Sequence, residues 1–328
     1  MGLFQIGYRR YEGPRTKQSM RWLPITRTGV AIAGQSKLVT WITRFAFLPF
    51  LYLAPFFFLV GRLTDPAGAT GPYATLSQGW LPPALRMQLA NDPAELRVAI
   101  WSGVFAFMGA FQLWMVVVIT ALVGPILISN DHRSRAFLIY FARPVSRLDY
   151  VLGKAGIIIS WLARVTLLPS LTLYAISILF SPSLETVMQT LPIVCFIILC
   201  SLGTIIPAAL IMLSMSSLVR QPKYAAAGWI IMCFFGAMAH PVLQLTHGFE
   251  DSRWTFLLSP YDTIRAFQFG LYDVANKARD VGIDQDFAGV IETLTSSDSA
   301  GLAAGWLLFV SIACLLFLLR RVEAPTRI

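Results

Sequence analysis

The sequence predicts an all-α membrane protein whose six transmembrane helices form one domain. Three observations predict this fold: an apolar composition, long intervals without charge, and an uneven distribution of Lys and Arg. Of the 328 residues, 56% are hydrophobic and 13% are charged, and the mean hydropathy is +0.65. Too few polar side chains remain to cover a soluble globule. We therefore expect residues 1–328 to form a single transmembrane domain.

Six intervals without Asp, Glu, Lys or Arg match the length of a membrane crossing. A helix crosses about 30 Å of hydrocarbon with roughly 17 to 25 residues. The intervals are 45–61, 98–130, 165–184, 186–219, 224–249 and 299–319. We expect helices because backbone groups in lipid must be paired internally, and the alternating pattern of barrel strands is absent.

Lys and Arg residues predict the orientation of these spans. Segments 1–44, 130–154, 219–224 and 320–328 together hold 18 basic and four acidic residues, whereas the connecting segments on the other side hold seven basic and 13 acidic residues. Basic residues are retained on the cytoplasmic side of a membrane. We therefore expect both termini to be cytoplasmic, in a bacterial-type inner membrane.

The N-terminal part of the chain is basic as far as residue 44. Between 30 and 45, apolar side chains fall on one helical face and polar side chains on another, which predicts an amphipathic helix in the headgroup layer. The apolar face consists of Leu38, Trp41, Ile42 and Phe45. The alternative is a cytoplasmic extension of the first span. Residues 62–97 are rich in Pro and Gly and predict an outer loop with at most short helices.

The second charge-free interval has 33 residues, so a continuous helix would measure roughly 50 Å and exceed the bilayer. Gly124-Pro125 predicts a break near its inner end. The third span is expected over about 155–180 and the fourth over about 187–217. A short inner loop at 219–223 then leads to the fifth span.

The outer segment 248–298 contains nine acidic residues. Within it, residues 256–272 are amphipathic, with Ser259 or Asp262 as helix N-cap. This stretch either dips into the outer leaflet between the fifth and sixth spans or forms an ordinary surface helix packed on the bundle. The sixth span ends at Arg320-Arg321, a cytoplasmic anchor.

The sequence contains no pattern typical of a catalytic, metal-binding or nucleotide-binding site. We expect a protein that is not an enzyme, binds no cofactor itself, and draws energy from a partner or an ion gradient. A gradient-driven transporter is the weaker expectation, because no Asp or Glu lies within a span. The pI of 9.7 does not indicate nucleic-acid binding, since the basic residues flank lipid spans; membrane lipids are the expected partner.

Arg164 is the one charged residue well inside a predicted span. A guanidinium at that depth is costly unless it faces the bundle interior, a water-filled cavity or another subunit. We expect it either to line a transport path or dimer interface, or to pair with backbone carbonyls.

The stretch NDHRSRAFLIYFARPVSRLDYVLGK, residues 130–154, mixes basic and apolar side chains between two long apolar runs. An acidic-basic cluster is followed by an apolar patch, an Arg-Pro-x-x-Arg step and a Gly-Lys that begins the next span. In this order the stretch resembles the permease subunits of ATP-binding-cassette exporters of the type-2 class. The six-span plan, the amphipathic lead-in helix and the amphipathic outer segment match the same family.

The resemblance implies that residues 131–142 form a coupling helix received by a separate nucleotide-binding subunit, which binds ATP and Mg²⁺. Apolar side chains would fill a groove on that subunit, and Pro144 would end the helix. The coupling residues implied are Asp131, Arg133, Arg135, Phe137, Leu138, Tyr140, Phe141, Arg143, Pro144, Arg147 and Lys154. Arg220 and Lys223 form a second inner loop. The alternative is a solvated loop on anionic lipid, which would explain the arginines but not the apolar residues.

Two functions follow as expectations. In the first, the chain pairs with a second copy or a related permease and exports a lipidic or amphipathic substrate. In the second, it passes ATP-driven motion to an extracytoplasmic partner through residues 248–298 without translocating a substrate.

Overall fold

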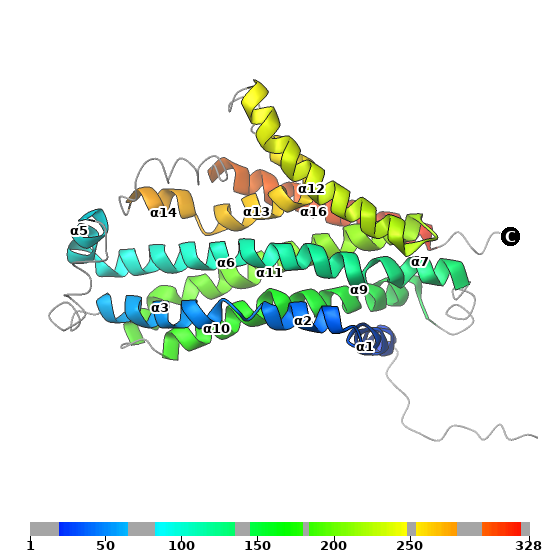
Figure 1. The fold of residues 1–328 in the computed structure, drawn as a ribbon, viewed down its shortest axis with the longest axis horizontal. Helices are drawn as coiled ribbons and strands as arrows, with labels where there is room; N and C mark the ends of the chain where they lie inside the picture. The colour runs from blue at the N-terminus through cyan, green and yellow to red at the C-terminus, as the bar shows by residue number, and fades with distance from the viewer. Residues whose placement is uncertain are drawn as a thin grey trace, which may run out of the picture.

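The computed structural model describes residues 20–64, 83–134, 145–179, 184–247, 254–280 and 297–322. All regular structure within these ranges is helical. Figure 1 shows an elongated bundle in which most long helices run approximately side by side, whereas α12 (Pro222–His247) leaves the bundle at an angle. One end contains the short helix α7 (Pro125–Ser134), and the other contains α5 (Pro83–Asn91). We call them the α7 end and the α5 end.

Six stretches among the described residues are long and apolar enough to cross a membrane, which confirms the predicted number of spans. They are Lys37–Leu63, Pro93–Ser134, Arg147–Leu179, Glu185–Leu218, Pro222–Leu243 and Ala300–Arg321. The helices in these stretches are α2 (Lys37–Phe45), α3 (Phe50–Leu63), α6 (Pro93–Val123), α7, α9 (Arg147–Val165), α10 (Leu167–Leu179), α11 (Leu184–Leu218), α12 (Pro222–His247) and α16 (Ser297–Arg321).

The N-terminal helices differ from the single amphipathic helix expected over 30–45. A turn after α1 (Trp22–Ala33) separates it from α2, and the turn residues 46–49 separate α2 from α3, although α2 and α3 both lie in the first candidate span. The location of α2 in the headgroup layer stays a prediction. In Figure 1, α1 is seen nearly end-on, so it crosses the bundle direction. It packs on α9, where the Thr26 hydroxyl donates to the Gly153 carbonyl at 3.0 Å.

The segment after α12 packs into the bundle. A short 3₁₀ helix, η2 (Thr255–Leu258), leads to α13 (Pro260–Leu271), which contacts α6, α11, α12 and α16. Ser259 caps α13 by accepting from the Asp262 N–H at 3.4 Å, as one of the two expected caps. The ring of Tyr261 lies 4.7 Å from that of Trp114. α13 therefore packs on the bundle, as the second alternative expects, and Asp262 is buried among helices although it lies outside the six spans.

Three apolar clusters form the core of the described residues, and two of them are large. The larger one joins α6, α7, α9 and α11 and includes the fully buried Ile128, Ile158 and Met212. The second cluster lies toward the α5 end and is rich in aromatic side chains. In it, the Phe57 ring meets the Trp101 ring edge-on at 4.9 Å. The α7 end thus contains a packed apolar core against which polar contacts can be fixed.

Candidate functional site at the α6–α7 break

The predicted break at Gly124-Pro125 is confirmed. α6 ends at Val123 and α7 begins at Pro125, which has no N–H to continue the helical hydrogen-bond ladder. Gly124 allows a close approach to α11, because a Cβ atom at this position would lie 2.3 Å from the Cγ atom of Met212. The break is therefore pressed directly against α11.

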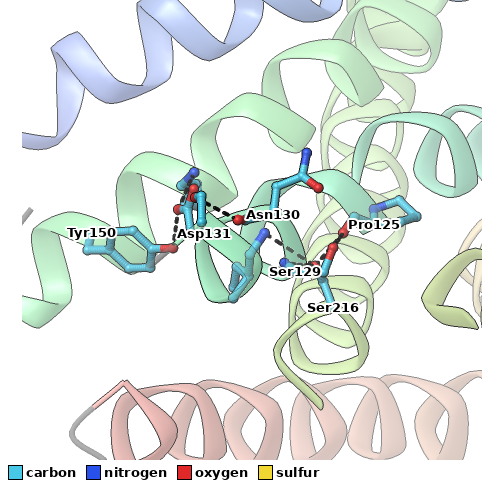
Figure 2. Close-up of polar contacts among 9 residues, drawn as sticks. Pro125, Ser129, Asn130, Asp131, Tyr150 and Ser216 are labelled. Atoms are coloured by element: carbon cyan, nitrogen blue, oxygen red, sulfur yellow. Dashed lines mark hydrogen bonds and ion pairs between the residues drawn. The ribbon is translucent and has the colours of Figure 1, made fainter. Parts of the chain in front are cut away.

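A serine from α11 supplies the hydrogen bonds that the break leaves open (Figure 2). The Ser216 oxygen accepts from the backbone N–H groups of Ile128 at 3.3 Å and Ser129 at 3.1 Å, and its hydroxyl donates to the Pro125 carbonyl at 2.7 Å. One donor and two acceptor positions use the full capacity of a hydroxyl group. Gly124 has no side chain to cap α7, so Ser216 caps it from a neighbouring helix.

An ion pair fixes the other side of α7 to α9. The Lys154 Nζ atom lies 2.7 Å from the Asp131 Oδ2 atom, and the Tyr150 hydroxyl donates to the same oxygen at 2.6 Å. Asp131 is 9% exposed and Lys154 is 7% exposed. A buried ion pair of this kind holds its helices in one register, because separating the charges would leave each of them unpaired. Figure 2 shows Asp131 and Tyr150 pointing toward each other between the two helices.

The start of α9 is also fixed. Ser146 and Asp149 form a reciprocal capping box: the Ser146 hydroxyl oxygen accepts from the Asp149 N–H, and Asp149 accepts from the Ser146 N–H, both at 3.1 Å. The described chain is thus held on both sides of residues 135–144, by α7 before them and by the α9 cap after them.

The predicted coupling residues fall into three groups. Asp131 and Lys154 are buried and bound to each other, so in this structure they position α7 and do not present a free surface. Arg133 and Arg147 are exposed at the ends of α7 and α9. The remaining seven lie outside the described residues: Arg135, Phe137, Leu138, Tyr140, Phe141, Arg143 and Pro144.

The second predicted inner loop lies at the same end of the bundle. Arg220 and Lys223 flank the turn between α11 and α12, and both are exposed. His132 of α7 interacts electrostatically with Arg220 and with Arg321 of α16. The α7 end therefore gathers basic side chains from four helices or their junctions.

Arg164 lies near the end of α9, close to the middle of the third candidate span. Its guanidinium carbon stacks over the Trp161 ring at 4.5 Å from the centroid. No ion pair joins it to a carboxylate in the described part of the chain, and the side chain is half-buried. The ring provides a cation–π partner on the same helix, a possibility that the sequence argument did not include.

Sequence reasoning missed Ser216 and a second polar site at the α5 end. There Arg97, 5% exposed, donates to the Thr64 side chain at 2.8 Å, the Thr64 carbonyl at 2.7 Å and the Thr186 hydroxyl at 2.6 Å. Arg97 borders a charge-free interval, and the sequence analysis places it at the end of the outer loop 62–97. The signal for Ser216 was the group Ser214, Ser216 and Ser217 within an otherwise apolar interval.

No protein-family model matches the chain, and a search of characterised proteins found no match either.

Proposed function

We propose that this chain is the membrane-spanning permease subunit of an ATP-driven exporter of the type-2 ATP-binding-cassette class. A separate nucleotide-binding subunit would hydrolyse ATP and bind at the α7 end. The observation that carries the proposal is the anchoring of the chain on both sides of residues 135–144. Ser216 and Asp131 hold α7 before this segment, and the Ser146–Asp149 box holds α9 after it.

The sequence of the anchored segment suits a docking contact. Phe137, Leu138, Tyr140 and Phe141 provide apolar and aromatic side chains, which dominate the energetics of protein interfaces. Arg135 and Arg143 flank them, and Arg133, Arg147 and Arg220 add exposed positive charge on the same end. An acidic rim around an apolar groove on the partner would complement this surface.

Firm attachment is what a force-transmitting contact requires. A push on residues 135–144 would reach α7 first, and α7 cannot shift alone without breaking the Ser216 hydrogen bonds and the Asp131–Lys154 pair. The motion would therefore pass to α9 and α11, two of the six candidate spans. In this proposal the moving spans expel a lipidic or amphipathic substrate, and a second copy or a related permease completes the pathway.

Co-purification tests the proposal. The chain, tagged and expressed in its own membranes, is expected to co-purify with an ATPase that carries a phosphate-binding Walker sequence. Combining Arg135→Glu with Phe137→Ala should abolish this association, because it reverses a charge and empties the apolar contact.

A matched pair at the opposite end, Arg86→Glu with Met87→Ala, changes an exposed arginine and an exposed apolar residue on α5 and should leave the association intact. Equal thermal stability of the two variants excludes misfolding as the cause. Undiminished ATPase binding by the Arg135 and Phe137 variant would overturn the proposal.

A further inference from the structure

A polar cavity lies near the middle of the bundle, away from the α7 end. Its polar lining comes from four parts of the chain that are distant in sequence: α6, the α9–α10 junction with α10, α11 and α13. These residues are Gln112, Thr166, Ser170, Ser201, Thr204 and Gln268. Gln112 and Ser201 are close to the midpoints of their candidate spans. Polar side chains at that depth require hydrogen-bond partners, because hydrocarbon offers none.

The hydrogen bonds of Gln268 leave one atom of its amide without a protein partner. The Gln268 Nε2 atom donates to the Thr204 hydroxyl oxygen at 2.9 Å, and the Thr204 hydroxyl in turn donates to the Cys200 carbonyl at 2.8 Å. Because Thr204 has spent its only proton on Cys200, it can only accept from Gln268. This order fixes the orientation of the amide.

The Oε1 atom of Gln268 is the amide atom that lies beside Gly109, another residue of the cavity lining. It is buried and has no hydrogen-bond partner among the described residues, and the whole side chain is only 3% exposed. A buried amide oxygen without a donor costs about 1 to 3 kcal/mol. Gly109 leaves room beside it, since a Cβ atom there would lie 3.1 Å from this oxygen.

The size and the lining of the cavity identify the ligand class. The space open to the centre of a water-sized molecule is about 20 Å³, which exceeds the roughly 10 to 15 Å³ that one water needs. The space is too small for a lipid or another drug-sized molecule. The lining contains no Asp or Glu, so a cation would have no counter-charge at this depth.

We infer that this cavity binds one water molecule, which donates to the Gln268 Oε1 atom and accepts from or donates to the Ser201 hydroxyl. The water links α13 to α11 near the centre of the bundle. This inference concerns the attachment of α13 and is independent of any ATPase at the α7 end.

Solid-state NMR of the full chain in lipid bilayers tests the water directly. Magnetisation transferred from water protons should reach the Gln268 side-chain amide quickly. The control is the Trp229 indole N–H, which is also buried but donates to the Val117 carbonyl at 3.0 Å. Transfer to Gln268 that is no faster than transfer to Trp229 would overturn the inference.

A double-mutant cycle tests it independently. Gln268→Met should lower the thermal unfolding midpoint, and Ser201→Ala should lower it by less. The double variant should fall no further than Gln268→Met alone, because the water that both residues bind is already lost. Fully additive losses, or an unchanged midpoint for Gln268→Met, would contradict the water site.

Discussion

At the α5 end, the buried Arg97 donates to oxygens of Thr64 and Thr186, whereas at the α7 end the buried Lys154 is paired with Asp131. Lys277 repeats the first arrangement, with its Nζ atom donating to the Ser102 hydroxyl and the Tyr272 carbonyl, both at 2.9 Å. The described contacts of Arg97 and Lys277 are thus with neutral oxygens, to which Asp273 adds an electrostatic interaction with Lys277, whereas the described partner of Lys154 is a carboxylate.

The difference suggests separate roles for the two ends. The Arg97 contacts connect the end of α3 to the beginnings of α6 and α11, so they close the bundle at this end. The contacts at the α7 end hold a short helix that has been separated from α6 by a break. A short helix needs such fixation only if its position matters, and the exposed arginines beside it lie where we propose that the ATPase binds.

The largest expected effect comes from the Asp131–Lys154 pair. Asp131→Ala should destabilise the fold by about 3 to 5 kcal/mol, because it leaves a buried ammonium group without its anion. The double variant Asp131→Leu with Lys154→Met should recover much of this loss. Equilibrium unfolding in mixed detergent micelles measures both values. A loss below about 1 kcal/mol for Asp131→Ala would show that the pair is solvated. The two ends of the bundle would then not differ in how they hold a buried cation.

Arg97→Leu tests the α5 end. The variant leaves the buried oxygens of Thr64 and Thr186 without their donor, and we expect a loss of about 2 to 3 kcal/mol in the same unfolding measurement. The matched control is Arg62→Leu, an exposed arginine at the same end, which should change stability by less than about 0.5 kcal/mol. If the proposed division of roles is right, Arg97→Leu lowers stability but leaves ATPase co-purification in the surviving protein unchanged.

The smallest loss of stability is expected for Ser216→Ala, which tests the contact between α7 and α11 alone. It removes one oxygen that serves two N–H groups and one carbonyl, and interhelical hydrogen bonds of this kind contribute about 1 to 2 kcal/mol within a membrane. Ser217→Ala is the control, because the Ser217 hydroxyl donates at 2.7 Å to the Ser214 carbonyl of its own helix. Equal losses for the two serines would show that Ser216 does not connect α7 to α11.

The spans and the break could be predicted from the sequence because both depend on local properties. Charge-free length defines a candidate span, and a proline without an N–H interrupts a helix wherever it occurs. The split between α1 and α2 was not predicted, and the apolar face that indicated a helix over 30–45 lies wholly within α2, after the turn.

The polar contacts could not be predicted because they join residues far apart in the chain. Asp131 and Lys154 were both predicted as coupling residues, but no local sequence pattern shows that they pair with each other. An amphipathic stretch such as 256–272 has the same pattern whether it packs on lipid or on neighbouring helices, so the burial of α13 required the tertiary structure.

The most direct test of the account is the distance between α7 and α11 during the ATPase cycle. Spin labels at the exposed positions Asn130 and Leu218, in a chain whose native cysteines are replaced by alanine, report this distance by pulsed electron resonance. In the complex with its ATPase, we predict the same distance with and without a non-hydrolysable ATP analogue, and a broader distribution after Ser216→Ala. A wild-type distance that changes when the nucleotide binds would show α7 moving independently of α11 and would contradict the account.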